Sequence, residues 1–318
     1  MSKKYKFEAD VSDVRLDIFL VNKLPELSRT LIQHCIKSGL IRVNDLHVKA
    51  SMKINIGDCI DCNIKDKEFN RDISPEHIPL NIVFEDKDII VIDKPAGLVV
   101  HPGSGNRNGT LVNGLLHHCN ELSDINFMRP GIIHRLDKNT SGIMVIAKNN
   151  NAHFKVSEQF RNRQVKKIYY ALAWGRMKEE GSVEGYIRRD THNRIRFKVS
   201  EGNGKFSKTK YYLKNHFGPV SLVELHPETG RTHQLRVHLN SIGHPIFADD
   251  DYSGGKNRIK SCHVKYTRDL KRLFKTIDRV ALHAKSISFM HPTENEMVSF
   301  SAPLPHDFNE AINLFLNE

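Results

Sequence analysis

The chain has 318 residues, of which 39% are hydrophobic and 27% are charged, so it can bury the core of one large domain or of two ordinary ones. Its longest apolar runs, such as residues 143–147, are far too short to cross a bilayer, and no membrane association is expected. The first ten residues, MSKKYKFEAD, lack the apolar stretch of a secretory signal. The five cysteines are scattered and odd in number. Both features predict a cytoplasmic protein.

Positive charge is concentrated in one part of the chain. Lysine and arginine number 48 against 37 acidic residues, which gives a net charge of +11. Residues 161–214 alone hold 15 basic and 5 acidic residues and therefore carry +10. A surplus that served only solubility would be spread along the chain, whereas a local surplus favours a polyanionic partner. A solvated basic face without a partner is the alternative.

A small separate module is predicted over residues 12–64. Residues 16–24 have helical apolar spacing, and a second helix is expected from an N-cap at Ser28 to a stop at Gly39. Short strands follow, first at residues 40–43 and then, after a turn at Asn44-Asp45, as far as residue 64. The pattern is that of two helices followed by a small sheet.

The second predicted helix has a polar face. Arg29, Gln33 and Lys37 recur at intervals of four residues, so they are predicted to stand in line and point outward. A polar, partly basic stripe beside a small sheet suits contact with a sugar–phosphate backbone. We therefore expect these three side chains to bind nucleic acid.

A polar stretch at residues 65–80, with two prolines and no periodicity, is predicted to be a linker. Residues 81–318 contain many short strand-like runs with turn signals between them and a few helical stretches. This pattern of short strands and occasional helices predicts an α+β domain around a largely antiparallel sheet. The predicted strands are 82–86, 88–94, 131–137, 142–148, 167–175, 193–199, 209–214 and 220–226, and the predicted helices are 110–118, 150–161 and 232–242.

The basic segment contains an alternating pattern at residues 194–199. A strand with this pattern would bury one face and display Arg194, Arg196 and Lys198 on the other. Together with Arg188, this row is the predicted contact for the polyanionic partner.

A polar loop, HRLDKNTSG, lies between the predicted strands at 131–137 and 142–148. Asp137 is thereby held on a tight connection, where a rigid scaffold can position its carboxylate. The loop also imitates the opening of a calcium loop, but the closing acidic position is occupied by Lys148. An aspartate that only caps the turn is the alternative when this loop is considered by itself.

A second constellation, ETGRTHQLR, runs from Glu228 to Arg236 and places a turn before the predicted helix at 232–242. Arg231 lies at the start of that helix and is available to pair with a buried carboxylate. Four histidines nearby, at 226, 233, 238 and 244, lack the spacing of a helical metal site, and no metal is expected. Cys59 and Cys62 form a single C-x-x-C without a second pair. No phosphate-binding or dinucleotide fingerprint is complete, so no cofactor is expected.

These motifs resemble those of the RluA-type pseudouridine synthases. The resemblance rests on KPAGLVVHPG, HRLDKNTSG, KKIYYALAWG, GRTHQLRVHL and RVALHAKSISFMHP, in this order, over roughly residues 80–305. The module at 12–64 resembles the S-four-type RNA-binding domain. The resemblance implies a cofactor-free enzyme that isomerises uridine to pseudouridine in RNA, most similar to the branch that acts on large-subunit ribosomal RNA. Transfer RNA as target, and a non-catalytic ribosome-assembly factor, are the alternatives.

The resemblance also implies roles for individual residues. Asp137 matches the catalytic aspartate of the family, Arg231 the arginine that pairs with it, and Tyr169 the tyrosine under the uracil. Three more residues are implied in substrate binding: Arg135, which fills the gap left by the flipped uridine, Leu235, which packs against the base, and His134. A monomer that binds ribosomal RNA or a pre-ribosomal particle is expected.

The chain departs from the family pattern at one place. A glycine-aspartate pair usually precedes the family's tyrosine-glycine turn, whereas here the run is Ala248-Asp-Asp-Asp-Tyr-Ser253-Gly254. The departure is expected to change a loop without changing the chemistry, and any effect is expected on RNA contacts.

Overall fold

The computed structural model describes residues 2–316 except 26, 28, 66–72, 104, 127–128, 192 and 194. The contacts of the chain divide it into two compact units. The first comprises residues 1–78, 101–132 and 147–153, and the second comprises residues 79–100, 133–146 and 154–318. The predicted boundaries at 12–64, 65–80 and 81–318 stay a prediction, and part of the predicted linker, residues 66–72, lies outside the described residues.

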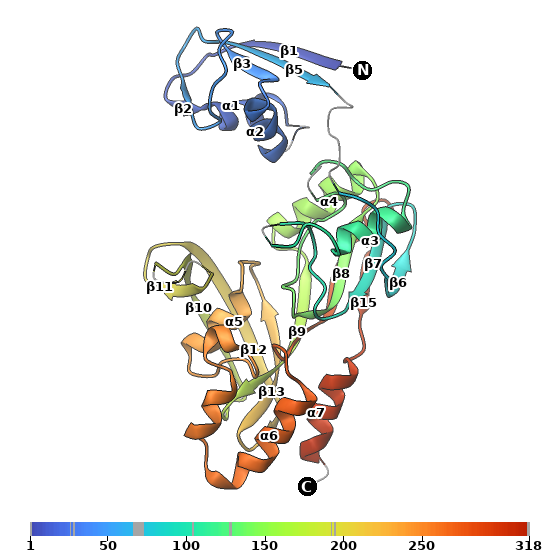
Figure 1. Cartoon of the computed structure of the whole chain (residues 1–318), viewed down its shortest axis with the longest axis vertical. Coiled ribbons are helices and arrows are strands. Elements are labelled where there is room, and N and C mark those ends of the chain that lie inside the picture. Colours follow the sequence, from blue (N-terminus) through green and yellow to red (C-terminus); the bar gives the residue numbers. More distant parts are fainter. Residues whose placement is uncertain are drawn as a thin grey trace. The chain divides into compact units, whose positions relative to one another are not determined.

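The N-terminal module of the first unit packs two helices against a small antiparallel sheet of order β1-β5-β3 (Figure 1). Its elements are β1 (Ser2–Glu8), β2 (Val14–Arg15), α1 (Leu16–Lys23), α2 (Arg29–Lys37), β3 (Ile41–Val43), β4 (Lys53–Ile54) and β5 (Cys59–Lys65). Leu20, Ile32, Ile36 and Ile60 are fully buried in one cluster, so the helical and the alternating patterns converge on one core. The predicted helices and short strands are confirmed, and the proposed cap Ser28 lies outside the described part of the chain.

The remainder of the first unit is mostly loop around one helix, α3 (Leu111–His118). Thr110 and Asn113 form a capping box at its N-terminus, because each side chain bonds to the backbone or side chain of the other. The Asn113 side chain also donates to the carbonyl of Ser74, which ties the segment after residue 72 to this helix. The predicted helix at 110–118 is therefore confirmed.

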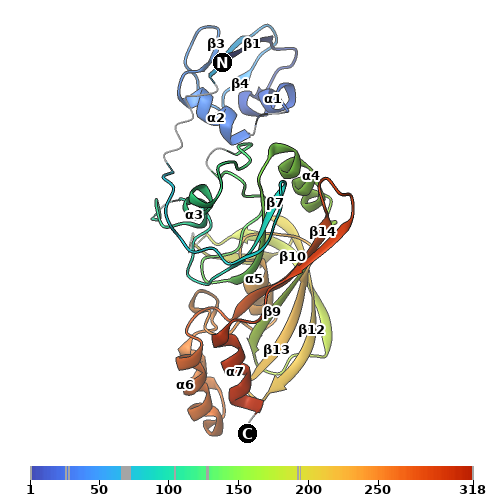
Figure 2. The same ribbon diagram turned by 90° about the vertical axis from the view of Figure 1, so that its right-hand side faces the viewer.

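The second unit is built on one large sheet of order β11-β10-β12-β13-β9-β14-β8-β7-β6, with β15 paired to β14 (Figures 1 and 2). The strand β14 pairs in parallel with β8 and antiparallel with β9 and β15. Mostly antiparallel pairing confirms the predicted α+β class. The strands are β6 (Ile82–Glu85), β7 (Ile89–Lys94), β8 (Ser141–Ala147), β9 (Lys166–Trp174), β10 (Glu180–Arg189), β11 (Phe197–Ser200), β12 (Lys205–Phe217), β13 (Val220–Pro227), β14 (Leu282–Met290) and β15 (Met297–Ser301).

Helices cover the sheet and close its core (Figure 2). Trp174, Phe247 and Phe274 contact one another with ring centroids 4.2–6.1 Å apart, and they join β9 to α6 in one buried cluster. The helices are α4 (Asn150–Arg161), α5 (Gln234–Ser241), α6 (Thr267–Thr276) and α7 (His306–Leu316), with short 3₁₀ turns at Asp250–Tyr252, Lys256–Ser261 and Val264–Tyr266. The predicted helices at 150–161 and 232–242 are confirmed.

Two predicted strands are wrong in whole or in part. Residues 131–137 form turns and irregular backbone, so only β8 flanks the polar loop that follows. The predicted strand at 193–199 begins only at Phe197, and all four residues of β11 are partly buried. The expected alternation of one buried and one cationic face is therefore absent from β11. Among the described residues, no helix has the length and apolar character needed to cross a membrane.

Candidate functional site

Three hydrogen-bond donors hold the backbone of the loop that carries Asp137. Lys94 Nζ and the backbone N–H of Gly97 both donate to the carbonyl of Lys138, at 3.1 and 2.9 Å. Arg279 Nη1 donates to the carbonyl of Asn139 at 3.2 Å. Because backbone carbonyls are bound, the loop is fixed without any use of the Asp137 side chain. The carboxylate therefore stays available for chemistry.

Lys94 is fully buried, and its ammonium group donates hydrogen bonds to backbone carbonyls. Besides Lys138, its ammonium group donates to Pro95 at 2.7 Å and to Leu98 at 3.0 Å. Burial, reinforced by the positive charge of Arg279, lowers the pKa of Lys94 to about 7. Three acceptors within hydrogen-bond distance make Lys94 a clamp that joins β7 to the Asp137 loop.

Gly142 sets the position of the strand that leaves the loop. It has φ +112°, and a Cβ there would overlap the backbone of Ala284 on β14. A residue without a side chain is required for this close parallel approach. The two strands thus meet directly after the loop that holds Asp137.

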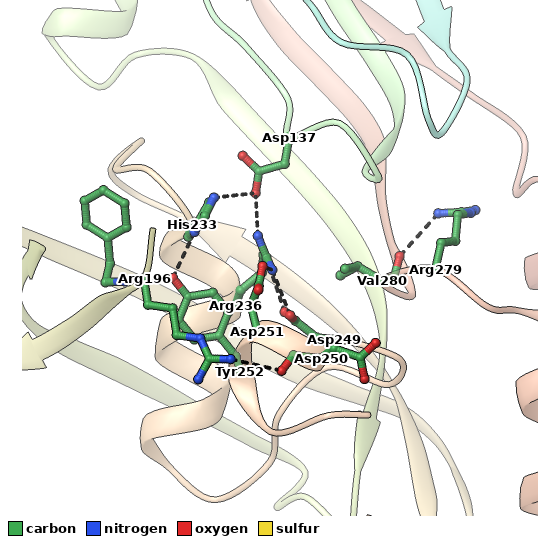
Figure 3. Close-up of polar contacts among 11 residues, drawn as sticks. Asp137, Arg196, His233, Arg236, Asp249, Asp250, Asp251, Tyr252, Arg279 and Val280 are labelled. Atoms are coloured by element: carbon green, nitrogen blue, oxygen red, sulfur yellow. Dashed lines mark hydrogen bonds and ion pairs between the residues drawn. The ribbon is translucent and has the colours of Figure 1, made fainter. Parts of the chain in front are cut away.

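Asp137 faces Arg236 and His233 (Figure 3). Its Oδ2 lies 3.5 Å from Arg236 Nη1 and 3.9 Å from His233 Nε2, and its side chain is 26% exposed. The prediction that Arg231 pairs with this carboxylate is wrong, because the guanidinium beside Asp137 belongs to Arg236. The physical reason is helical phase: Arg231 precedes α5, whereas Arg236 lies within the helix on the side that faces the loop.

Arg236 is itself fixed by carboxylates. Its Nε and Nη2 donate to the two oxygens of Asp249, both at 2.7 Å, and Nη2 donates to Asp251 at 2.8 Å. The guanidinium also lies 4.8 Å from the centre of the Tyr252 ring. Burial alone would lower the pKa of Arg236. The hydrogen bonds and negative charge of Asp249, together with Asp137 and Asp251, outweigh burial and raise this pKa. A permanently charged, immobile cation therefore stands beside Asp137.

His233 connects Asp137 to Tyr252. The residue has φ +55° at the start of α5, and its Nδ1 lies 2.8 Å from the Tyr252 hydroxyl. That hydroxyl accepts a hydrogen bond from the backbone N–H of Phe197 at 2.9 Å, so it is left to donate to His233. Burial lowers the pKa of His233 despite the charge of Asp137. A neutral ring then carries its proton on Nε2, toward the carboxylate.

Arg231 contacts a different part of the molecule. Its Nε donates to the carbonyl of Phe206 at 3.2 Å, and its backbone N–H donates to the Gln234 side chain at 3.0 Å. Arg231 lines the same cavity as Asp137, but it contacts the backbone near the start of β12. Its place is therefore suited to a bound substrate and not to the carboxylate.

A cavity of about 640 Å³ contains the residues predicted for catalysis and substrate binding. Asp137, Tyr169, Leu235 and Arg236 are among those that line it, and Leu235 is 7% exposed. Burial, with the negative charge of Asp137, raises the pKa of Tyr169, so its phenol is neutral near pH 7. Burial also lowers the pKa of the nearby Lys167 to about 8. The cavity combines apolar walls with a few polar groups, as small-ligand sites do.

His134 and Arg135 both line the cavity but differ in their surroundings. The His134 ring stacks on Phe160 with centroids 4.8 Å apart, and its Nε2 accepts from the Val145 N–H at 3.1 Å. Burial, with the charge of Lys167, lowers the pKa of His134 to about 3, so its ring is neutral. Arg135 is exposed at the cavity. The His134 ring is thus held by contacts within the protein, whereas Arg135 faces solvent.

The predicted RNA-binding residues are only partly free. Arg29 and Lys37 are exposed, as predicted, whereas Gln33 is partly buried. Arg29 and Gln33 both donate to the buried Asp17 of α1. The predicted row on the second unit is also divided. Arg196 Nη2 reaches the Asp250 carbonyl at 3.5 Å, Lys198 lies 3.5 Å from Asp190, and Arg194 lies outside the described residues. The Arg188 side chain has neither a hydrogen bond nor an ion pair with any residue that the structure describes.

Arg236 and Asp249 are the functional residues that sequence reasoning missed. The run Asp249–Asp251 was noted only as a departure, yet it supplies the carboxylates that hold Arg236. The sequence did contain a signal. Arg231 and Arg236 both lie near the start of the helix, and an arginine that is buried there needs acidic partners. Residues 248–254 are therefore part of the site and not a peripheral loop.

The four histidines near the site do not converge. Besides His233, His226 lies 2.7 Å from Glu224, His238 binds the hydroxyls of Ser207 and Thr209, and His244 bonds to the Trp174 carbonyl. Each ring is bound separately, so this group is not a ligand set for one metal ion.

The chain is similar to known proteins. The RNA pseudouridylate synthase family model matches residues 88–241, and the S4 domain model matches residues 14–60. Ribosomal large subunit pseudouridine synthase D of Neisseria meningitidis serogroup B is 42% identical over 94% of this chain and 78% of its own. An RNA pseudouridine synthase of Aquifex aeolicus is 40% identical over 97% and 96% of the two chains. The solved structure of human RNA Pseudouridylate Synthase Domain Containing 1 covers 74% of this chain and 89% of its own, with 27% identity and a TM-score of 0.56.

Proposed function

Because the chain belongs to the RNA pseudouridine synthases, which are isomerases, we propose that it converts uridines of large-subunit ribosomal RNA to pseudouridine with Asp137 as the catalytic carboxylate. One observation carries the role of Asp137: its carboxylate lies in the cavity, 3.5 Å from the immobilised guanidinium of Arg236. The ribosomal target is supported by the similarity to the Neisseria meningitidis enzyme, whose name states that target.

The reaction breaks the bond between N1 of uracil and C1′ of the ribose, and it forms a bond between C5 and C1′. The proton on C5 is lost and one is gained at N1, so the base is isomerised without water or redox chemistry. A carboxylate can act as the nucleophile or as a base at the sugar while the uracil turns. The positive charge of Arg236 lies 3.5 Å from Asp137 and can orient its carboxylate, and the 26% exposure leaves the carboxylate accessible to substrate.

Tyr169 and Leu235 would hold the uracil in the cavity. Tyr169 keeps its proton near neutral pH because burial raises its pKa, so we assign it to stacking under the base in the ground state. Leu235 offers an apolar wall on another side. A base confined between such groups can turn without leaving the cavity.

The target uridine must leave its helix to reach Asp137, because the carboxylate lies inside a cavity. Extrusion costs a few kcal/mol and is easiest for an unpaired base, so loops of the ribosomal RNA are the expected targets. Arg135 is exposed at the cavity and is positioned to occupy the place that the base leaves.

Release of tritium from RNA labelled at uridine C5 tests the proposal. Large-subunit ribosomal RNA, transfer RNA and pre-ribosomal particles are compared, each with the wild type and with Asp137→Asn. We expect release from ribosomal RNA or its particles, and a loss of roughly 10³-fold or more in the variant, with RNA affinity retained. Release from transfer RNA alone would overturn the target. Binding to all three substrates without release would favour an assembly factor.

A further inference from the structure

The β10–β12 region carries an open aromatic pair. Tyr186 on β10 and Phe206 on β12 are directly opposite each other, with ring centroids 5.8 Å apart in an edge-to-face arrangement. They are 38% and 36% exposed, which is unusual for two large aromatic side chains in contact. A cross-strand pair can serve the sheet alone, so the pair needs a second observation to indicate a ligand.

The second observation is the charge on the same face. Side chains two apart on a strand, or directly opposite on its neighbour, share a face of the sheet. Arg188 therefore stands beside Tyr186, and Lys198 of β11 is opposite Arg188. Lys208 stands beside Phe206 on β12. We call Tyr186, Phe206, Arg188, Lys198 and Lys208 the aromatic–basic face.

Arg188 is the cation of this face that has no protein partner. Its Nε is buried without a hydrogen bond, and no nitrogen of its side chain is paired with a described residue. Lys198 and Lys208 lie 3.5 and 3.4 Å from Asp190 and Glu184, at partly exposed ion pairs that are weak in water. An unpaired guanidinium beside exposed rings favours an anionic ligand that also has flat aromatic groups.

The opposite face of these strands is covered around Ile187. Ile187 is 5% exposed and packs in a cluster with Val237 of α5 and Tyr252. The aromatic–basic face, in contrast, leaves both of its rings exposed to a ligand. It also adjoins the cavity, because Arg231 lines the cavity and donates to the Phe206 carbonyl at 3.2 Å.

We propose that the aromatic–basic face binds an unpaired stretch of RNA that flanks the target uridine, with bases stacked on Tyr186 and Phe206 and a phosphate held by Arg188. This inference rests on the proposed function for the identity of the RNA, and it adds a second contact outside the cavity. Stacking on aromatic rings combined with backbone cations is the general mode of single-strand binding, and it tolerates different sequences. A paired helix would not offer its base faces to these rings.

Binding of oligouridine to the full-length protein, measured by fluorescence anisotropy over a range of KCl concentrations, tests the face. Tyr186→Leu with Phe206→Leu should weaken binding by about tenfold while the salt slope stays unchanged, because stacking releases no counterions. The exchange Tyr186→Phe with Phe206→Tyr should keep the affinity. Arg188→Gln should reduce the salt slope by about one, because one phosphate contact is lost.

Phe84→Leu is the matched control. Phe84 is 37% exposed and contacts Phe300 at 5.1 Å, so it is a comparable surface aromatic pair in the same unit. If the leucine double variant binds oligouridine as Phe84→Leu does, the proposal is overturned and the face is left to a protein partner. Thermal melting shows whether the leucine double variant still folds. If it does not, the variant with Tyr186→Phe and Phe206→Tyr and the variant Arg188→Gln still test the proposal.

Tritium release by the wild type on ribosomal RNA is measured in parallel. Failure of the proposed function appears as no release by the wild type, whereas failure of this inference appears as unchanged oligouridine binding in the variants of the face. The two outcomes are therefore distinguishable.

Discussion

Each unit of the chain contains a buried charged side chain held by several ionic partners, and the two charges are opposite in sign. In the first unit the buried charge is the carboxylate of Asp17, which is fully shielded from solvent. Arg15 donates to both of its oxygens at 3.0 Å, Arg29 donates twice at 2.9 and 3.1 Å, and Gln33 adds a further bond. Every partner approaches within hydrogen-bond distance, so the network closes on itself.

In the second unit the corresponding group is the guanidinium of Arg236 (Figure 3). Its side chain is 8% exposed. Asp249 and Asp251 bind it tightly at 2.7–2.8 Å, whereas Asp137 remains 3.5 Å away. The same kind of network is therefore left open at one end, and the loosely held group is the proposed catalytic carboxylate. A closed network stabilises a module, and an open one can also orient a reactive group.

The largest expected effect comes from the buried cation. Arg236→Lys keeps the charge, but a single ammonium cannot reproduce the two-pronged contact with Asp249 and also reach Asp137. We expect tritium release to fall by roughly 10²-fold or more, because the field and orientation at Asp137 are lost. Stability to urea should fall by about 3 kcal/mol, because the fully buried Asp249 loses part of its compensation.

Arg231→Lys is the matched control for that variant. Arg231 donates to a backbone carbonyl and is not paired with Asp137, so the loss of activity should be clearly smaller. If Arg231→Lys abolished release while Arg236→Lys retained it, the pairing predicted from the sequence would be right and the structural one wrong.

The next largest effect is expected at Asp17. Asp17→Asn should lower the stability of the N-terminal module by about 2 kcal/mol, because hydrogen bonds to a charged acceptor become neutral ones. Since its network is closed and separate from Asp137, tritium release from a saturating substrate should change little. Urea denaturation followed by circular dichroism measures the first effect. Loss of release at saturation would contradict the structural role.

The same carboxylate gives a pH dependence with a definite sign. Burial alone would raise the pKa of Asp17, but hydrogen bonds from Arg15, Gln33 and Arg29 outweigh it and hold the pKa below its ordinary value near 3.8. A carboxyl whose pKa is lowered by folding stabilises the fold above the pKa of the unfolded chain. This contribution is therefore complete above about pH 5 and is lost as the pH falls below about 4. Asp17→Asn should remove that part of the acid dependence.

Much of the fold was predictable because regular apolar spacing determines local structure. The helical spacing at residues 16–24 and 150–161 gave α1 and α4 nearly to the residue. The two wrong strand predictions have different causes. Ile132 is 8% exposed in an irregular segment, because an apolar side chain need not lie on a strand to be buried. In the pattern at 193–199 the apolar Ile195 is 72% exposed, and the strand begins only at Phe197.

The error at Arg231 has a different cause. Assignment of a helix face requires one side to be polar, and α5 has six successive buried residues from Gln234 to Leu239. Such a helix gives no sign of which side meets the loop at Asp137. The carboxylates that hold Arg236 follow α5 at residues 249 and 251, so their approach depends on tertiary packing that no local pattern contains.

A smaller effect is expected where the acidic partners differ in burial. Asp251 is 46% exposed and makes one bond to Arg236, whereas Asp249 is fully buried and makes two. Asp251→Asn should reduce tritium release by only a few-fold, because solvent already screens this pair. Asp249→Asn should reduce it much more, since the fork that orients Arg236 is lost. Equal losses in the two variants would contradict the distinction.

The smallest expected effect concerns the backbone of the loop that carries these carboxylates. Ser253 has φ +62° at an exposed position, where a side chain costs about 1–2 kcal/mol relative to glycine. Ser253→Gly relieves this strain but increases the freedom of the unfolded chain, which costs about 0.4–1 kcal/mol. We therefore expect a net gain in stability of up to about 1 kcal/mol, measured by urea denaturation. Ala248, at φ +59° and 8% exposed, is the contrasting position: Ala248→Gly also removes a buried methyl group, so its gain should be smaller. A loss of stability in Ser253→Gly would show that the seryl side chain contributes more to the loop than its backbone conformation costs.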